Sequence, residues 1–237
     1  SIGSAGSTSA SRQTWMSGGA VLKACEAVVD ALLLDLSSEN GVAYDKSGLN
    51  LVSKDGSHSI DISAALRGRN YDEHVTHRHK RTFPLDHNGQ GNAHVSFAFA
   101  AHRAVVDVDE ELGLVRVVEI ATSQDVGRVL NPVQARGQIE GGIAQGLGLA
   151  LLEDLVLDNG KIVNANFSDY LLPTSMDTPP IKIASLIEQS EPGAPFGAKG
   201  IGEPPVISST PAIISAVRNA TGKKLNRVPI KPEDLIF

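Results

Sequence analysis

The segment from Asn131 to Leu152 gives the clearest helical pattern in the chain, and this predicted helix is rich in glycine. Asparagine is a favoured N-cap residue, proline is tolerated at the first helical position, and an apolar periodicity continues to Leu152. A glycine in a helix interior costs about 1 kcal/mol relative to alanine, so the pattern needs a reason, such as close approach by another backbone or a ligand. Gln145 lies among the glycines and either faces such a ligand or is merely exposed on a tightly packed helix. The glycines are Gly137, Gly141, Gly142, Gly146 and Gly148.

A second glycine-rich stretch covers residues 195–205, PFGAKGIGEPP. Its glycines permit positive φ angles and leave backbone N–H groups uncovered. The two prolines that follow Glu203 restrain the exit of the loop and hold its carboxylate at a defined point. A flexible surface loop needs neither feature, so the stretch indicates a preformed site rather than a connector.

The first residues, 1–14, are small and polar and lead into a predicted amphipathic helix over residues 16–36. The apolar positions of this helix recur at helical spacing, and Thr14 or Ser17 is expected to cap it. A loop of hydroxyl groups with Arg12 that runs into a helix N-terminus is suited to hold an anion. A solvated N-terminal tail is the alternative.

Residues 45–48 predict a turn between two short strands, residues 60–66 a short helix, and residues 69–92 a long polar loop. Clustered histidines in this loop could ligate a metal ion. A solvated connector is favoured instead, because the loop has no nearby thiolate and basic residues are interleaved. The histidines are His74, His77, His79 and His87.

Residues 93–109 alternate as one long or bent strand, and residues 114–121 form a second strand that pairs with it as a hairpin. The predicted fold class is α+β, with antiparallel strands packed against two long helices. The whole chain, residues 1–237, is expected to form one domain or two lobes split near residues 69–92. The remaining predicted elements are a turn at 158–160, a strand at 181–187, a helix at 211–220 stopped by Thr221 and Gly222, and an extended piece at 227–237.

Composition excludes several classes of protein. The net charge is −6 and aromatic residues make up 4% of the chain, so a nucleic-acid groove is not expected. The single cysteine, Cys25, can form neither an intrachain disulfide nor an iron–sulfur site. No apolar run is long enough for a membrane span and no secretory leader is visible, so the expected location is the cytoplasm. A start at Ser1 without methionine suggests a processed chain or a fragment.

Four segments, in order along the chain, resemble the molybdenum-cofactor subunit of the xanthine dehydrogenase and aldehyde oxidase family of molybdenum hydroxylases. A single glycine-rich loop would be weak support, whereas four segments in family order are specific. The resemblance covers essentially the whole chain but only the C-terminal part of a typical member's cofactor-binding polypeptide. The segments are TSASRQTWMSGGAVLKAC (8–25), QDVGRVLNP (124–132), GQIEGGIAQGLGLALLED (137–154) and GAKGIGEPP (197–205).

The resemblance implies that Glu203 is the active-site base beside the molybdenum, taking a proton as an oxygen derived from water attacks an electron-poor carbon. It places Gln145 against the pterin, with Gly146 letting the ring system come close. Ala10 is placed next to the metal, without being a side-chain ligand. Lys199 either contacts the dithiolene side of the cofactor or complements the charge of Glu203. The cofactor-binding residues implied are Ser9, Ala10, Ser11, Arg12, Gln13, Thr14, Gln145, Gly146, Ala198, Lys199 and Gly200.

The same resemblance implies a molybdenum–molybdopterin cofactor, in a dinucleotide form, and electron transfer to iron–sulfur (2Fe-2S) clusters and FAD on partner chains. The family's other cofactor loops are absent from this sequence. The chain is therefore expected to bind half of the molybdenum site and to need a companion molybdopterin-binding chain that carries the first half.

The expected substrate is a purine such as xanthine or hypoxanthine, or another small N-heteroaromatic, because the sequence looks most like bacterial xanthine dehydrogenase chains. An aldehyde oxidase and a nicotinate-type hydroxylase are close alternatives, and a carbon monoxide dehydrogenase is less favoured. From another class, a non-catalytic scaffold subunit could share the fold. Retention of both Glu203 and Gln145 argues against a scaffold, which has no use for a base beside a cofactor loop.

Overall fold

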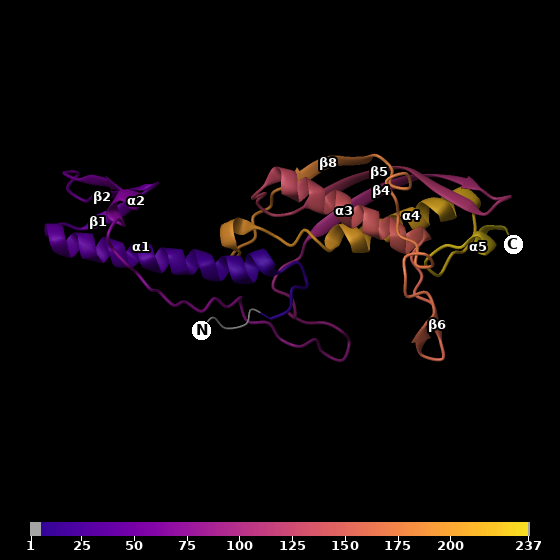
Figure 1. Ribbon diagram of the computed structural model, residues 1–237, viewed down its shortest axis with the longest axis horizontal. Helices are drawn as coiled ribbons and strands as arrows, with labels where there is room; N and C mark the ends of the chain where they lie inside the picture. Colours follow the sequence, from indigo (N-terminus) through magenta and orange to yellow (C-terminus); the bar gives the residue numbers. More distant parts are fainter. Residues whose placement is uncertain (1–5, 237) are drawn as a thin grey trace. The chain divides into compact units, whose positions relative to one another are not determined.

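The structure, a computed structural model, describes residues 6–236. These residues form two compact units (Figure 1). The first unit contains residues 6–7 and 13–80, and the second contains residues 8–12 and 81–236. The second unit therefore includes a short N-terminal piece, residues 8–12, that is distant in sequence from the rest of the unit.

The first unit is built on one long helix, α1 (Gly19–Asn40), which follows a π-helical turn, η1 (Thr14–Gly18). Three short antiparallel strands and a helical turn pack near its C-terminal end: β1 (Tyr44–Ser47), β2 (Asn50–Ser53), β3 (Ser59–Asp61) and α2 (Ile62–Ala65). The unit has its own small core, made by Leu32, Leu36, Tyr44, Leu51 and Ala65.

The boundaries of this helix correct the sequence prediction at both ends. Thr14 and Ser17 lie inside η1 and are not caps, and the N-cap position, Gln13, makes no side-chain cap hydrogen bond. At the other end the helix continues to Asn40, where Gly41 adopts a φ of 68°. Its last turn is polar, so apolar periodicity gave no sign of it. The predicted turn at 45–48 is also displaced, because β1 extends to Ser47.

The second unit is built on a three-stranded sheet in the order β4-β5-β8. The hairpin of β4 (Phe99–Asp109) and β5 (Leu114–Asp125) confirms the predicted antiparallel pair, with a register shift between Val105 and Val106. Strand β8 (Ile181–Ile187) pairs with β5 in parallel, so the sheet is mixed. Residues 93–98, which the alternation predicted as the beginning of this strand, lie outside the observed β4.

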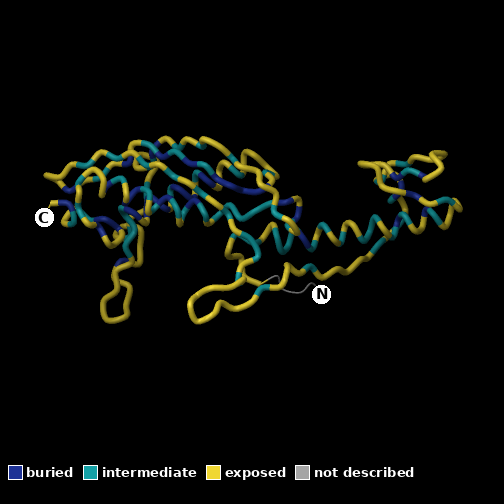
Figure 2. The backbone as a smooth tube through the Cα atoms, turned by 180° about the vertical axis from the view of Figure 1, so that it is seen from behind, coloured by how far each residue is buried: buried dark blue, intermediate teal, exposed yellow. Residues whose placement is uncertain are grey.

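Helices α3 (Pro132–Leu151) and α4 (Pro204–Thr221) pack against each other and beside this sheet (Figures 1 and 2). Alternate residues of β4 and β5 face them and are at least partly buried. Helix α3 starts as predicted, because the Asn131 side chain accepts a hydrogen bond from the Gln134 N–H at 3.1 Å. The core residues of this unit are Val117, Ile120, Val126, Ile139, Ile143, Leu147, Ala150, Ile213, Ile214, Val217, Leu225, Ile230 and Leu235.

Helix α4 begins earlier than predicted. Its first residues are Pro204 and Pro205, which suit the opening of a helix because the first helical N–H groups need no partner within the helix. The prediction started at Pro211, which instead lies inside the helix. The C-terminal piece is also not wholly extended, since residues Pro232–Ile236 form a short helix, α5. Within the described residues, no helix has the length and apolar character that a membrane crossing needs.

Four of the five glycines of α3 fall into two groups, and the fifth, Gly148, lies against Glu153, whose Oε1 an added Cβ would overlap. A Cβ on Gly142 would lie 2.8 Å from Pro205 Cβ, and a Cβ on Gly146 would overlap Ser209 Oγ on α4. Close approach of α4 therefore explains these two glycines, and the predicted contact of Gly146 with a pterin ring stays a prediction. Gly137 and Gly141 face open space in the described structure.

This division predicts opposite effects for two matched substitutions in α3. Gly146→Ala is expected to destabilise the protein by about 1–2 kcal/mol, because overpacking against buried Ser209 exceeds the gain in helix propensity. Gly141→Ala is expected to stabilise it by up to about 1 kcal/mol, since nothing opposes the added methyl group. Urea unfolding of the two variants and the wild type measures both changes. Equal shifts for both variants would contradict the packing explanation.

Candidate functional site

The glycine-rich loop is fixed by the turn that follows β5. The N–H of Lys199 donates to the Val126 carbonyl at 2.9 Å, and the N–H of Arg128 donates to the Gly197 carbonyl at 3.0 Å. Gly127 has a φ of 60°, and a Cβ there would overlap the Gly197 carbonyl oxygen. The segments 124–132 and 197–205, which the sequence analysis singled out separately, therefore form one structural element.

A buried ion pair joins the same two segments. Lys199 Nζ lies 2.5 Å from Asp125 Oδ2, and the two side chains are only 6% and 8% exposed. The Gly127 N–H donates to the other Asp125 oxygen at 3.2 Å. The Lys199 ammonium therefore serves Asp125, which corrects the alternative that it complements Glu203. It also lies 5.8 Å from the centre of the Phe99 ring.

The N-terminal piece of the second unit contacts the end of the glycine-rich loop. The backbone N–H of Glu203 donates to Ser11 Oγ at 2.9 Å. A Cβ on Gly200 would lie 2.9 Å from Ser11 Cβ, and one on Gly202 would lie 3.2 Å from Ser11 Oγ. The loop at residues 8–12 thus packs so closely against the glycine-rich loop that side chains at positions 200 and 202 would not fit between them.

The backbone at this contact adopts a conformation that L-residues seldom take. Ala10 has a φ of 54° and Ser11 a φ of 50°, and neither is glycine. Left-handed non-glycine residues are disfavoured and concentrate at functional sites, where the surrounding structure holds them in place. Here the left-handed turn presents Ser11 to Glu203.

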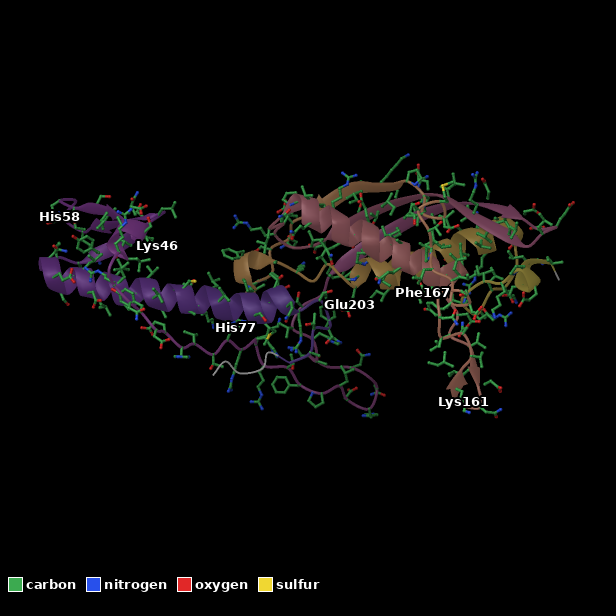
Figure 3. All side chains as sticks on the ribbon, viewed as in Figure 1. Lys46, His58, His77, Lys161, Phe167 and Glu203 are labelled. Atoms are coloured by element: carbon green, nitrogen blue, oxygen red, sulfur yellow. The ribbon has the colours of Figure 1, made fainter. Side chains whose placement is uncertain are left out.

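Glu203 occupies the residue before α4, and Figure 3 shows it labelled at this end of the unit. Its side chain is exposed, and within residues 6–236 its carboxylate makes neither a hydrogen bond nor an ion pair. In the same described region, the N–H groups of Gly200, Ile201 and Gly202 donate no hydrogen bond. A row of uncommitted backbone donors beside a carboxylate suits an anionic, heteroatom-rich ligand together with a proton acceptor.

Helix α3 contributes a glutamine that the sequence analysis missed. Gln138 Oε1 lies 3.5 Å from the position of a Cβ on Gly202. Gln138 precedes Gln145 by seven residues, so the two lie on the same face of the helix. That spacing was the signal that could have found it. Gln145 is exposed, two turns further along α3.

The remaining predicted residues fall into both units. Ser9, Ala10 and Arg12 lie with Ser11 in the second unit, whereas Gln13 and Thr14 belong to the first, so a shared role in one site stays a prediction for them. Among the described residues no three His, Cys, Asp or Glu side chains are placed to hold a metal ion, and this includes the histidines of the 69–92 loop.

A polar cluster under the first turns of α4 was also missed by the sequence analysis. His102 Nε2 lies 2.7 Å from Ser208 Oγ and 3.3 Å from Gln124 Nε2. Ser208 in turn donates to the Pro204 carbonyl, next to Glu203. Burial lowers the pKa of His102, which favours the neutral ring. Three residues far apart in the sequence therefore support the helix start that carries Glu203.

Comparison with known proteins gives consistent matches. A family model described as a molybdopterin cofactor-binding domain matches residues 1–179. The xanthine dehydrogenase molybdenum-binding subunit of Escherichia coli O157:H7 is 39% identical over 140 residues, covering 58% of this chain and 18% of that subunit. The 6-hydroxypseudooxynicotine dehydrogenase complex subunit gamma of Paenarthrobacter nicotinovorans is 31% identical over 236 residues, covering 95% of this chain and 29% of that subunit.

The fold has a counterpart among solved structures. Reconstituted CO dehydrogenase from Oligotropha carboxidovorans matches with a TM-score of 0.76 at 18% identity, covering 97% of this chain and 29% of that chain. At this identity the likeness shows the fold and nothing more. In each of these three comparisons the chain spans less than a third of the protein that it matches.

Proposed function

The chain belongs to the molybdopterin cofactor-binding domain family, and from this premise we propose that it forms part of the active site of a molybdenum hydroxylase, with Glu203 as its general base. The observation that carries the proposal is the Ser11–Glu203 contact, which joins two of the family-like segments at an exposed carboxylate. The whole chain is proposed to act as the C-terminal molybdopterin-binding domain of that enzyme.

The residues of the site fit this cofactor. A pterin with a phosphate-bearing tail needs many hydrogen-bond donors, and the site offers hydroxyls, amides, a guanidinium and the uncommitted N–H groups of the loop at 200–202. Ala10 is proposed to lie beside the metal of the cofactor without ligating it through its side chain. The residues proposed to hold it are Ser9, Ala10, Ser11, Arg12, Gln13, Thr14, Gln145, Gly146, Ala198, Lys199 and Gly200, and the structure adds Gln138 as a further candidate.

When bound, the molybdenum cofactor supplies a Lewis acid and an acceptor for two electrons. The Glu203 carboxylate takes a proton from the attacking oxygen, which derives from water, and holds that proton on one of its two oxygens. The Glu203 N–H, bonded to Ser11 Oγ, orients the residue. The Lys199–Asp125 pair holds the loop in register, which keeps the carboxylate at one place.

The proposed substrate is an N-heteroaromatic such as xanthine or hypoxanthine, supported by the relative named for xanthine. An aldehyde and a nicotinate-type substrate are the alternatives. Electrons are proposed to pass to 2Fe-2S clusters and FAD on partner chains, because one cysteine cannot hold a cluster. We also propose a companion polypeptide that carries the first half of the site. The pterin is proposed to be in a dinucleotide form, and the proposed location is the cytoplasm.

Metal analysis of the natively purified assembly tests this function. Molybdenum at about one atom per copy of the chain is expected, together with co-purifying iron–sulfur and flavin proteins identified by mass spectrometry. The Ser11→Trp variant is expected to lower the molybdenum content, because it removes the hydroxyl that accepts the Glu203 N–H and places a bulky ring beside Gly200. A preparation with neither molybdenum nor these partners would overturn the proposal.

A further inference from the structure

The segment between α3 and β8 carries a dense group of exposed apolar side chains. Residues 155–176, here called the arm, include the short hairpin of β6 (Leu157–Asp158) and β7 (Lys161–Ile162), which stands away from the sheet and helices of its unit (Figures 1 and 2). Phe167 is 80% exposed and Met176 is 91% exposed. The other exposed apolar residues of the arm are Leu155, Val156, Leu157, Ile162, Val163, Leu171 and Leu172.

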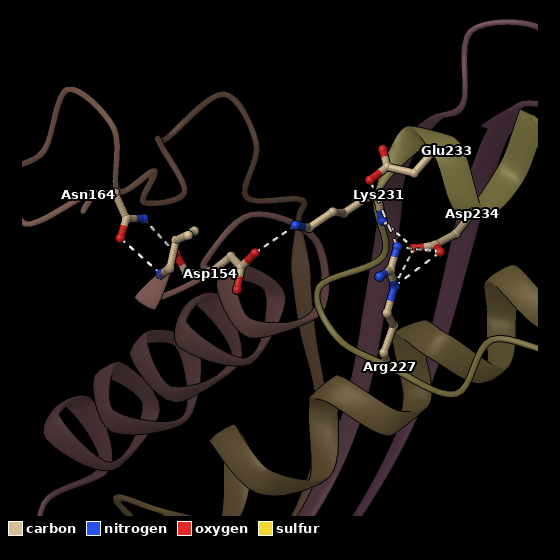
Figure 4. Close-up of polar contacts among 7 residues, drawn as sticks. Asp154, Asn164, Arg227, Lys231, Glu233 and Asp234 are labelled. Carbon is tan, nitrogen blue, oxygen red and sulfur yellow. Dashed lines mark hydrogen bonds and ion pairs between the residues drawn. The ribbon is translucent and has the colours of Figure 1, made fainter. Parts of the chain in front are cut away.

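The base of the arm is held by hydrogen bonds. Asn164 donates to the Asp154 carbonyl at 2.6 Å and accepts from the Val156 N–H at 2.9 Å (Figure 4). The Tyr170 hydroxyl donates to Glu153 at 2.7 Å. These bonds fix both strands of the arm to the end of α3, so its apolar side chains are presented in a defined arrangement.

An ion-pair network ties the same base to the C-terminal segment. Lys231 Nζ lies 2.7 Å from Asp154, and Arg227 lies 2.8 Å from Asp234, as Figure 4 shows. The carboxylate of Asp154 raises the pKa of Lys231 through a hydrogen bond. Exposed apolar side chains that gather on one segment mark interaction surfaces, whereas scattered ones are ordinary on soluble proteins.

The charges of the arm restrict which kinds of protein surface can bind to it. Asp158 and Asp169 lie among its apolar residues, against the single basic residue Lys161, and Asp177 follows its last residue directly. A second copy of the arm would bring like charges together, and residues 13–80 of this chain contain more acidic than basic residues. A complementary partner is thus an apolar surface with a basic rim on another stretch of polypeptide.

We propose that the arm is the docking surface for the part of the molybdopterin-binding polypeptide that this sequence lacks and its relatives contain. This inference rests on the proposed function. The relatives indicate this occupant, because the chain covers only 18% and 29% of their length and they therefore contain further polypeptide. The match to the family model extends across the arm to residue 179, so the arm belongs to the family's domain.

Site-specific photocrosslinking in the native assembly tests the proposal. The photoreactive residue p-benzoyl-phenylalanine replaces Phe167, which keeps the ring and adds no charge. The matched control places it at Leu112, which is 61% exposed in the turn of the β4–β5 hairpin. Crosslinks from position 167 are expected on the companion molybdopterin-binding polypeptide, identified by mass spectrometry, with none to it from position 112. Crosslinks from position 167 to residues 13–80, to a second copy, or to nothing would overturn the proposal.

A second experiment introduces negative charge into the apolar surface of the arm. Phe167→Asp with Met176→Asp is expected to lower recovery of the companion at least about tenfold, since exposed aromatic anchors dominate such interfaces. Leu112→Asp is expected to leave recovery unchanged, and equal recovery for both variants would contradict the docking role. Molybdenum content of the wild-type assembly separates the two proposals. A molybdenum-loaded assembly with crosslinks elsewhere refutes only the arm, whereas an assembly without molybdenum refutes the function and the arm together.

Discussion

Replacement of Glu203 by glutamine is expected to lower turnover by about a hundredfold or more, because a general base contributes roughly that much to the rate. Glutamine keeps the volume of the side chain but cannot take the proton. The hydrogen bond to Ser11 Oγ comes from the backbone N–H, so the substitution leaves it in place. The measurement is kcat and kcat/KM of the natively assembled enzyme, with molybdenum content determined on the same preparation.

The control for this experiment is Glu110→Gln, an exposed carboxylate in the turn of the β4–β5 hairpin. Both variants change one charge on the same unit, but only Glu203 lies beside the glycine-rich loop. We expect wild-type turnover for Glu110→Gln and wild-type molybdenum content for both. Full turnover in Glu203→Gln would favour the scaffold interpretation, in which the carboxylate has no chemical role.

Local sequence signals predicted those elements whose ends are set by residues close to them in the sequence. Helix α3 was predicted from the Asn131 cap and the following proline, and its observed end, Leu151, lies one residue from the predicted one. The β4–β5 hairpin was predicted from alternation. For α4, Pro211 predicts a helix start seven residues later than the observed one at Pro204. A proline signals either the start of a helix or a kink within it, and tertiary packing decides between them.

The arrangement of the site depends on contacts between distant residues, which no local pattern contains. Lys199 and Asp125 are 74 residues apart, and Ser11 and Glu203 are 192 apart. The sequence placed all four of them in family-like segments, yet it did not indicate which would pair. The left-handed backbone at Ala10 and Ser11 was also not predictable, because neither residue favours it.

The reason for the glycines in α3 shows the same limit. Close approach by a backbone and close approach by a ligand both account for the glycine pattern, and periodicity cannot distinguish the two. The structure places α4 against Gly142 and Gly146 and leaves Gly137 and Gly141 open. Gln138 lies in the family-like segment 137–154, and its seven-residue spacing from Gln145 marks the face that they share.

Removal of one partner of the buried Lys199–Asp125 pair is expected to destabilise the protein by about 3–5 kcal/mol, because the remaining charge stays in a desolvated position. Lys199→Met leaves Asp125 with the Gly127 N–H as its remaining donor. The exposed pair Arg116–Asp107, 2.7 Å apart, provides the control, and Arg116→Met is expected to change stability little because solvent screens that pair. Urea unfolding measures both changes, and equal losses would contradict the importance of burial.

The double variant Lys199→Met with Asp125→Leu separates stability from positioning. A buried ion pair is weak evidence for stability, since well-packed apolar residues of similar volume often replace it without loss. We therefore expect the double variant to recover much of the stability that Lys199→Met loses. Turnover is expected to stay low, because Asp125 no longer accepts the Gly127 N–H and the turn that holds the loop of Glu203 loses that restraint. Recovery of turnover together with stability would show that the pair only fills space and does not position the base.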